Sequence, residues 1–233
     1  MSNSRLALII PAAGSGERLG TTVPKPYLKL ADKTILEHTL TQFLQIHGLQ
    51  SVVVSTSDKY IKQTETILSR LFPDITTQVV LGGVERQHSI MNALSVISSD
   101  DIDLVAIHDA VRPFVDQDSI RNCIELSSKV GGAIVAVSAK DTIKVSDEGR
   151  FVLQTPDRKS LWQAQTPQIF RIDLIKRAYQ QAQKDGFLGT DDSSLVEHLG
   201  GKVAIVEGNR ENFKITYPLD FKLAEWLIEK NNG

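Results

Sequence analysis

Six short apolar runs, rich in β-branched residues and without polar alternation, recur along the 233 residues and constrain the fold more than any other feature. Strands that are apolar on both faces are typical of a parallel sheet with helices packed on each side. The segments between the runs place apolar residues at helical spacing. This alternation predicts an α/β fold. The predicted strands are Leu6–Pro11, Ser51–Ser55, Thr77–Leu81, Asp103–Ile107, Ala133–Val137 and Lys202–Val206, and the predicted helices are Ile35–Ile46, Lys59–Leu71, Glu85–Ile97, Asp118–Lys129 and Leu219–Lys230.

The pattern continues over 1–233 without an internal repeat or linker, so we expect a single Rossmann-like domain with a mostly parallel, twisted sheet and helices on both faces. Residues 139–159 are the exception. There, Asp147, Glu148 and Gly149 separate two strand-like segments, which predicts a protruding β-hairpin arm within the domain. A lone two-stranded hairpin is marginally stable in water, so the arm is expected to lie against another surface.

The composition excludes several classes of protein. The formal net charge is −2, so no basic excess favours binding to nucleic acid or to an anionic membrane. No apolar stretch is long enough to span a bilayer. Cys123 is the single cysteine, so an internal disulfide is impossible and a reducing cytoplasm fits. Its apolar helical position favours a packed thiol over a nucleophile.

The first predicted strand ends in a glycine loop, PAAGSGERLG (11–20). Loops of this kind point backbone N–H groups toward phosphate. A dinucleotide fingerprint needs glycine at position 19, which is Leu19, and a Walker loop needs lysine where Thr21 stands. Both common glycine motifs are therefore excluded.

Two cations belong to this region. Arg18 lies inside the loop, and Lys25 lies between Pro24 and Pro26. The prolines favour a stiff, extended backbone around Lys25, which lowers the entropic cost of ordering its ammonium group. Two cations beside a glycine loop suit a polyphosphate whose charge grows during a reaction. The alternative is an ordinary strand-to-helix turn with solvated charges.

Seven blocks in collinear order resemble the 2-C-methyl-D-erythritol 4-phosphate cytidylyltransferases of the non-mevalonate isoprenoid pathway. The first, PAAGSGERLG followed by PKPYL (24–28), is similar to nucleotidyltransferases that join a nucleoside triphosphate to a phosphorylated sugar or polyol. The others narrow the match; they are LGGVERQHSIMNAL (81–94), HDAVRP (108–113), DTIK (141–144), LWQAQTPQIF (161–170), GTDDSSLVE (189–197) and FKITYPLD (213–220).

The resemblance implies a homodimeric enzyme that transfers CMP from CTP to methylerythritol phosphate and releases pyrophosphate. It implies that each active site borrows Thr142 and Arg158 from the arm of its partner, and that Asp109 holds Mg²⁺ or another divalent cation. The implied catalytic residues are Arg18, Lys25, Arg158 and Lys214. The implied CTP-binding residues are Pro11, Ala12, Ala13, Gly14, Ser15, Gly16, Arg18, Lys25, Gly82, Gly83, Arg86, Ser89 and Asp109. The implied acceptor-binding residues are Asp109, Arg112, Thr142, Arg158, Thr166, Thr190 and Lys214.

Some of these assignments also follow from the residues themselves. Asp109 and Arg112 come directly after a predicted strand, and ligands in open α/β sheets bind beyond the carboxyl ends of strands. A carboxylate there suits Mg²⁺, and a guanidinium suits phosphate. Taken alone, Asp109 could instead cap a helix and Arg112 could form a surface ion pair. QTPQ (165–168) and GTDD (189–192) could be simple turns, and His108 is expected to be only a neighbour.

A phosphate monoester is already mostly a dianion at neutral pH, so its attack on the α-phosphorus of CTP needs no general base. Two positions depart from the family pattern: Pro26 replaces an expected glutamine, and Leu19 stands where methionine is common. A ribitol-5-phosphate cytidylyltransferase, which would make CDP-ribitol, is therefore the nearest alternative. A non-catalytic nucleotide sensor is a more remote one.

Overall fold

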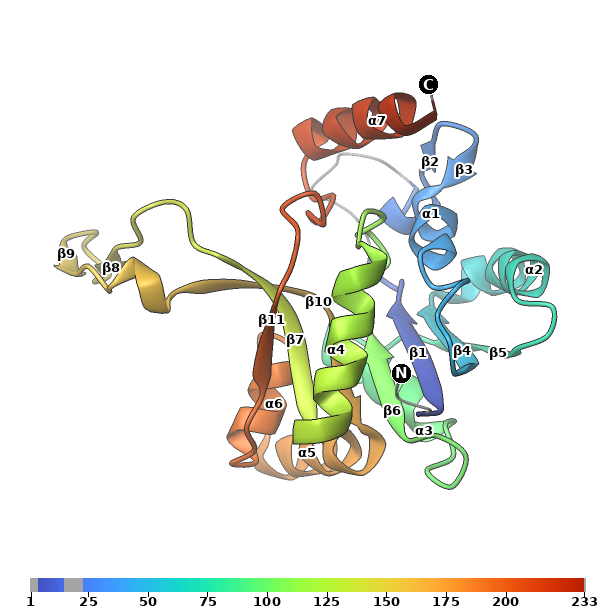
Figure 1. Ribbon diagram of the computed structural model, residues 1–233, viewed down its shortest axis with the longest axis horizontal. Coiled ribbons are helices and arrows are strands. Elements are labelled where there is room, and N and C mark those ends of the chain that lie inside the picture. The colour runs from blue at the N-terminus through green and yellow to red at the C-terminus, as the bar shows by residue number, and fades with distance from the viewer. Residues whose placement is uncertain (1–3, 15–22, 233) are drawn as a thin grey trace.

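The computed structural model describes residues 4–14 and 23–232. Its centre is a seven-stranded sheet with the order β11–β7–β10–β6–β1–β4–β5 (Figure 1). Strand β10 runs antiparallel to β6 and β7, and the other neighbouring strands are parallel. The predicted α/β fold with a mostly parallel sheet is therefore confirmed. The strands of this sheet are β1 (Leu6–Pro11), β4 (Leu49–Thr56), β5 (Thr76–Leu81), β6 (Leu104–Ile107), β7 (Gly132–Ser138), β10 (Trp162–Arg171) and β11 (Ala204–Glu207).

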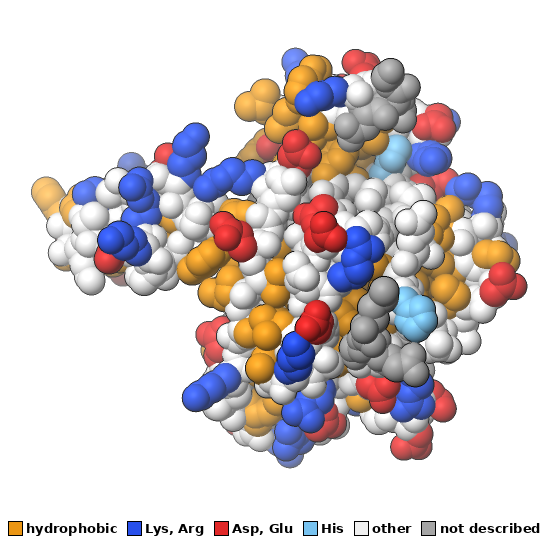
Figure 2. Space-filling view, viewed as in Figure 1, with side chains coloured by type: hydrophobic (Ala, Val, Ile, Leu, Met, Phe, Trp, Pro, Cys, Tyr) orange, Lys and Arg blue, Asp and Glu red, His pale blue; other side chains and the backbone are white. Residues whose placement is uncertain are grey.

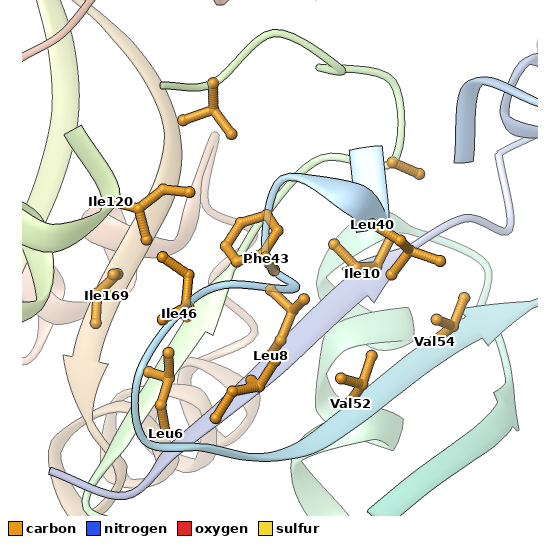
Figure 3. Packing of buried hydrophobic residues seen from close by; sticks show 14 of the residues in the cluster. Leu6, Leu8, Ile10, Leu40, Phe43, Ile46, Val52, Val54, Ile120 and Ile169 are labelled. Carbon is orange, nitrogen blue, oxygen red and sulfur yellow. The ribbon is translucent and has the colours of Figure 1, made fainter. Parts of the chain in front are cut away.

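Helices cover both faces of the sheet because its central strands are apolar on both sides. Leu6, Leu8 and Ile10 of β1 point into one core, where Leu40 and Phe43 also lie (Figure 3). Ala7 and Ile9, which alternate with them, belong to the core on the other face. The first core packs against α1 (Ile35–Thr41), α2 (Ile61–Leu71) and α4 (Gln117–Val130), and the second against α3 (Arg86–Ser95), α5 (Ile172–Asp185) and α6 (Asp192–His198).

Local signals fix the ends of several helices. Thr34 and Glu37 form a reciprocal capping box at the start of α1. The Asp116 side chain accepts the Ser119 N–H at the start of α4, and Gly131, with a φ of 102°, follows its last residue. Helix α4 therefore begins at Asp116 rather than at Asp109, which leaves the Asp109 carboxylate available for another role.

Besides the short elements described below, the sequence patterns missed β10, α5 and α6. Strand β10 carries polar residues that are buried in the sheet, so its sequence lacks the apolar pattern of its neighbours. The Gln168 amide, for example, donates to Asp191 and accepts from the Ser193 N–H. QTPQ is not a simple turn but part of β10, at the place where its register with β7 shifts. These buried amides find their partners in distant segments, which periodicity does not reveal.

The predicted arm is present. Strands β8 (Val145–Ser146) and β9 (Val152–Gln154) pair antiparallel and stand away from the rest of the molecule (Figures 1 and 2). Phe151, Val152 and Leu153 are 60–74% exposed at this hairpin. The division into a domain over 1–233 with an arm over 139–159 stays a prediction.

The remaining elements complete the chain. Helix α7 (Pro218–Asn232) packs with Leu30, Ile35 and Val111 in a third, smaller core. Within the described ranges, no helix is both long enough and apolar enough to cross a membrane. The short elements are β2 (Lys29–Leu30), β3 (Lys33–Thr34) and the 3₁₀ turns Lys25–Tyr27, Asp58–Tyr60 and Arg158–Ser160.

Candidate active site

A cleft of about 620 Å³ opens at the carboxyl ends of β1, β5 and β6, where ligands bind in open α/β sheets. Its volume lies in the range of ordinary small-molecule sites. It is lined by Pro11, Ala12, Ala13, Gly14, Lys25, Pro26, Gly83, Val84, Glu85, Arg86, Ser89, Asp109, Ala110, Val111, Lys214 and Ile215.

Most of the predicted CTP-binding residues that the structure describes line this cleft. Lys214, predicted from the far end of the chain, joins them. Gly82 lies directly behind the wall, and Arg112 contacts the cleft through Asp109. Ser15, Gly16 and Arg18 lie outside the described residues.

Asp109 is the centre of a cluster of charges. Its carboxylate is 9% exposed and lies 3.2 Å from Arg86 Nε, 3.3 Å from Arg112 Nε and 3.1 Å from Lys214 Nζ. Burial alone would raise the pKa of Asp109, but Arg86, Lys214 and Arg112 together lower it below its ordinary value. Asp109 is therefore an ionised carboxylate. Since the Arg112 side chain is only 12% exposed, its pair with Asp109 is also not the surface contact considered above.

His108 fixes the backbone next to Asp109. Its ring is fully buried, and burial lowers its pKa from 6.5 to about 4, so the ring is neutral at pH 7. Nε2 lies 3.0 Å from the Arg112 carbonyl, which only accepts, so Nε2 carries the proton. Nδ1 then accepts from the Thr166 hydroxyl at 3.0 Å, and that hydroxyl accepts the Asp109 N–H at 3.0 Å. His108 was expected only to lie next to Asp109, but its ring links the Arg112 carbonyl to the Thr166 hydroxyl that binds the Asp109 N–H.

Lys25 is held firmly, although by a different backbone from the one expected. It begins the 3₁₀ turn Lys25–Tyr27 rather than an extended segment, because Pro26, which lacks an N–H, is tolerated in the first turn of a helix. The Tyr27 hydroxyl bonds Thr64 Oγ1 at 2.8 Å, and its ring stacks on Tyr60. The Lys25 ammonium group, 8% exposed as a residue, donates to the Thr216 carbonyl at 2.7 Å.

The segment 212–216 brings Lys214 to the cleft. Asn212 is fully buried and donates to the Thr166 carbonyl at 2.8 Å, while its own carbonyl accepts from Arg112 at 2.8 Å. The Ile215 N–H donates to the Val111 carbonyl at 2.9 Å. These bonds join β10, the loop after β6 and the segment before α7, which is why Arg112 and Lys214, from distant parts of the sequence, meet at one carboxylate.

Two glycines after β5 allow close packing, Gly82 against Ala13 of the glycine loop and Gly83 against His88 of α3. A Cβ at Gly82 would lie 2.2 Å from Ala13 Cβ, and a Cβ at Gly83 would lie 2.3 Å from His88 Cβ. Both distances are far below van der Waals contact, so neither position accepts a side chain without movement. The Gly83 N–H donates to Ser89 Oγ at 3.0 Å, which closes this wall of the cleft.

Five predicted acceptor-binding residues do not line the cleft in the single chain: Arg112, which reaches it only through Asp109, and Thr142, Arg158, Thr166 and Thr190. Thr142 and Arg158 lie on the exposed arm, where an Arg158 guanidinium nitrogen donates to the Lys140 carbonyl. Thr166 is buried behind Asp109 with its hydroxyl occupied as described above. Thr190 is exposed just before α6.

The sequence patterns missed three buried residues of this region: His108, Asp192 and Asn212. His108 and Asp192 lie inside blocks that resemble the family, and Asn212 directly precedes one, but their hydrogen-bond partners come from distant segments. Cys123 is fully buried, as predicted, and burial raises the pKa of its thiol to about 12.

The donor set fits a magnesium site that is completed by substrate. The described residues contain no group of three or more His, Cys, Asp and Glu side chains that could hold a metal by themselves. Mg²⁺ is commonly bound by one or two carboxylates together with phosphate oxygens. Asp109, ionised and at the floor of a cationic cleft, offers such a carboxylate.

Comparisons with known proteins agree with this geometry. Residues 6–230 match the sequence model of the 2-C-methyl-D-erythritol 4-phosphate cytidylyltransferase family. Proteins of that name from Caldanaerobacter subterraneus and Geotalea uraniireducens are 41% and 43% identical over 97% and 98% of this chain and 99% of their own. A crystal structure of 4-diphosphocytidyl-2C-methyl-D-erythritol synthase from Anaerococcus prevotii superposes with a TM-score of 0.87 at 29% identity, covering 97% of both chains. The cytidylyltransferase from Francisella tularensis superposes with a TM-score of 0.79 at 32% identity, over 96% of this chain and 99% of that one.

Proposed function

This chain belongs to the 2-C-methyl-D-erythritol 4-phosphate cytidylyltransferase family, and from that premise we propose how its cleft works. The enzyme transfers CMP from CTP to 2-C-methyl-D-erythritol 4-phosphate, giving 4-diphosphocytidyl-2-C-methyl-D-erythritol and pyrophosphate. The observation that carries the proposal is the convergence of Lys25, Arg86 and Lys214 on one cleft at the carboxyl edge of the sheet. Three cations from distant parts of the chain suit a ligand with several phosphates.

The wall formed by Pro11–Gly14 and Gly83–Ser89 receives the nucleotide. Ala12, Ala13 and Gly14 are small, and a Cβ at Gly14 would meet no atom of the described residues within 4 Å, which leaves room for a base and ribose beside this loop. Arg86 and Lys25 then face the triphosphate, and we assign Arg18 of the glycine loop to the same group.

The reaction is an in-line displacement at the α-phosphorus. A phosphate oxygen of the acceptor forms the new P–O bond, and the bond to the β-phosphate bridging oxygen breaks, so pyrophosphate carries away the electron pair. The attacking phosphate is already a dianion near neutral pH, so no protein base has to remove a proton. Lys25 stabilises the charge that builds on the α-phosphate and the leaving group, while Lys214 and Arg112 orient the acceptor phosphate.

We also propose that Asp109 holds Mg²⁺, or another divalent cation, together with the phosphates of CTP. When bound, the metal neutralises phosphate charge and fixes the geometry of the triphosphate. The three cations around Asp109 keep this carboxylate ionised before the substrate enters.

The arm supports a proposal about assembly. Thr142 and Arg158 are predicted acceptor ligands, but they lie on the exposed arm away from the cleft of their own chain. Phe151, Val152 and Leu153 are exposed beside them. A two-fold homodimer that exchanges arms would bury these apolar side chains and bring Arg158 into the partner's cleft.

Subunit mixing tests the shared site. The variants Lys25→Ala and Arg158→Ala are each inactive by this account. After random mixing half of the dimers are mixed, and one of their two sites carries neither defect, so roughly a quarter of all sites recovers. If Arg158 serves its own subunit, every site keeps one defect, and activity stays at the level of the parents once exchange of subunits has been verified.

Pyrophosphate release tests the reaction itself. We expect release from CTP to depend on methylerythritol phosphate and to be slower with ribitol 5-phosphate at equal concentration. Faster turnover of ribitol 5-phosphate would favour the CDP-ribitol alternative. No release with either acceptor would contradict the enzyme assignment and favour a nucleotide sensor. We propose a cytoplasmic location because CTP is a cytoplasmic metabolite and the one cysteine forms no internal disulfide.

A further inference from the structure

We propose that Asp192 is a positioning residue for the nucleotide, because it anchors the Arg86 guanidinium at the wall of the cleft. The inference rests on the proposed function in one respect, namely that CTP is the ligand of this cleft. Asp192 does not line the cleft itself, so any effect on the nucleotide has to pass through Arg86.

The contact between the two residues is close and buried. Asp192 is the first residue of α6, and its side chain has no exposed surface. Its Oδ2 lies 2.8 Å from Arg86 Nη2, although the two residues are 106 positions apart in the sequence. Its other oxygen accepts the hydroxyl proton of Tyr179, which is also buried. Both carboxylate oxygens therefore have a partner.

Arg86 is held between two carboxylates. Its Nε side faces Asp109 at 3.2 Å, and its Nη2 faces Asp192 at 2.8 Å. Burial by itself would lower the pKa of Arg86, but Asp192 and then Asp109 raise it above its ordinary value, so the cation is maintained. The Arg86 side chain keeps 31% exposure, which leaves part of the guanidinium open to the cleft.

The two carboxylates are not equivalent supports for Arg86. Asp109 is shared with Arg112 and Lys214, and in the proposed reaction it also holds the metal. Asp192 has no second cation among its described ion pairs, which are limited to Arg86. When the triphosphate enters and the charges around Asp109 rearrange, Asp192 is the partner that keeps Arg86 in place.

The start of α6, which carries Asp192, is held in place by further hydrogen bonds. Asp191 caps α6 through the Ser194 N–H and also accepts from the Gln168 amide at 2.8 Å. Gln87, next to Arg86, donates to the Phe187 carbonyl at 3.1 Å and accepts the Gly189 N–H at 3.0 Å. Arg86 thus binds the first residue of α6, and Gln87 binds the segment that leads into this helix. This support limits how far Asp192 can move, as a positioning residue requires.

Asp192→Asn is the sharpest variant, because it removes the charge and keeps the shape. The amide oxygen can still accept from Arg86, and the amide nitrogen can donate to the Tyr179 hydroxyl, which rotates to accept. We expect the Kd for CTP, measured by calorimetry without acceptor, to rise by ~10-fold. The KM for methylerythritol phosphate should change by less than ~2-fold by the same reasoning.

This pattern separates positioning from a general structural role. A variant that merely loses stability has fewer folded molecules, which lowers kcat and Tm but leaves the CTP affinity of the folded ones unchanged. Asp118→Asn is the matched control, since Asp118 pairs with Arg121 on the surface and its side chain is 85% exposed. We expect this control to bind CTP as the parent does.

A double-mutant cycle tests whether Asp192 acts through Arg86. In an Arg86→Gln background, Asp192→Asn should change the CTP affinity by less than ~2-fold, because the group it positions is gone. An equal loss in both backgrounds, or an unchanged CTP affinity in Asp192→Asn alone, would overturn the inference. If Asp192→Asn does not fold, Tyr179→Phe replaces it; it removes one hydrogen bond to Asp192, and an unchanged CTP affinity there would equally overturn the inference.

The same measurements keep this inference apart from the proposed function. A parent that binds CTP, loses affinity through Asp192→Asn as described and yet releases no pyrophosphate would refute the reaction while supporting the role of Asp192. A parent that releases pyrophosphate but shows no coupling between positions 86 and 192 would support the reaction and refute the role of Asp192. A parent that binds no CTP would overturn both.

Discussion

His108 is expected to make the folded protein sensitive to mild acid. The ring is completely buried, and burial lowers its pKa from 6.5 to about 4 although the hydrogen bond to the Arg112 carbonyl and the charge of Asp109 favour the charged form. Because the folded pKa lies below the value of an unfolded chain, the unfolded chain takes up the proton first as the pH falls. The contribution of His108 to stability is therefore complete above about pH 6.5 and is lost between about pH 6.5 and pH 4.

The size of this effect follows from the two pKa values. At about 1.4 kcal/mol for each pH unit, the interval from 6.5 to about 4 corresponds to a loss of about 3 kcal/mol. This is a sizeable part of the 5–15 kcal/mol that ordinarily separates folded from unfolded protein. It arises from one ring that touches the Arg112 carbonyl, the Thr166 hydroxyl and the edge of Phe43.

Urea denaturation at pH 7.5, 6.5, 5.5 and 4.5, in the presence of a chelator, measures this effect. His108→Gln serves as the reference, since glutamine cannot take up the proton while the other titrating groups stay the same. The free energy of unfolding of the parent should fall more steeply than that of the variant below pH 6.5, by about 2 kcal/mol between pH 6.5 and pH 4.5. Parallel curves for the two proteins would refute the reasoning.

Three further outcomes follow from the site. Asp109→Asn removes the carboxylate proposed for Mg²⁺, so the concentration of Mg²⁺ that gives half-maximal rate should rise by at least ~10-fold. An unchanged Mg²⁺ titration would show that Asp109 does not bind the metal and only pairs with the neighbouring cations. Gly82→Ala places a methyl group 2.2 Å from Ala13 Cβ, so Tm and CTP affinity should fall, with recovery of both in the Ala13→Gly/Gly82→Ala double variant. Cys123 is buried with a thiol pKa of about 12, so iodoacetamide should label it only in urea, and rapid labelling of the native protein would contradict this environment.

The elements that sequence patterns predicted are those whose residues determine their structure locally. β1 is apolar throughout and β4 carries the run Val52–Val54, so both were recognised as strands buried on both faces. β10 was missed because Gln165, Thr166 and Gln168 are polar, and they are buried only because distant groups satisfy their hydrogen bonds. Polar core strands of this kind cannot be recognised from periodicity.

The same distinction applies to the site. Gly82 and Gly83 were predicted to bind CTP, which stays a prediction; the structure shows that both positions need glycine because Ala13 and His88 pack against them. Asp192 was missed because it lies in GTDD (189–192), a sequence that is also typical of a simple turn. Its role depends on Arg86 of α3 and Tyr179 of α5, which local sequence does not reveal. The backbone of Lys25 was predicted to be extended and is instead a 3₁₀ turn, because local proline preferences allow both and packing of Tyr27 selects one.

The central claim is that Lys25 stabilises charge during CMP transfer in this cleft, and Lys25→Ala tests it most directly. Lys29→Ala is the matched control, since Lys29 lies four residues away and is exposed. Pyrophosphate release is measured with both substrates saturating, beside the Kd for CTP. Lys25→Ala should lower kcat by at least ~10²-fold while CTP affinity weakens much less, and Lys29→Ala should match the parent. A Lys25→Ala enzyme with near-normal kcat would contradict the account.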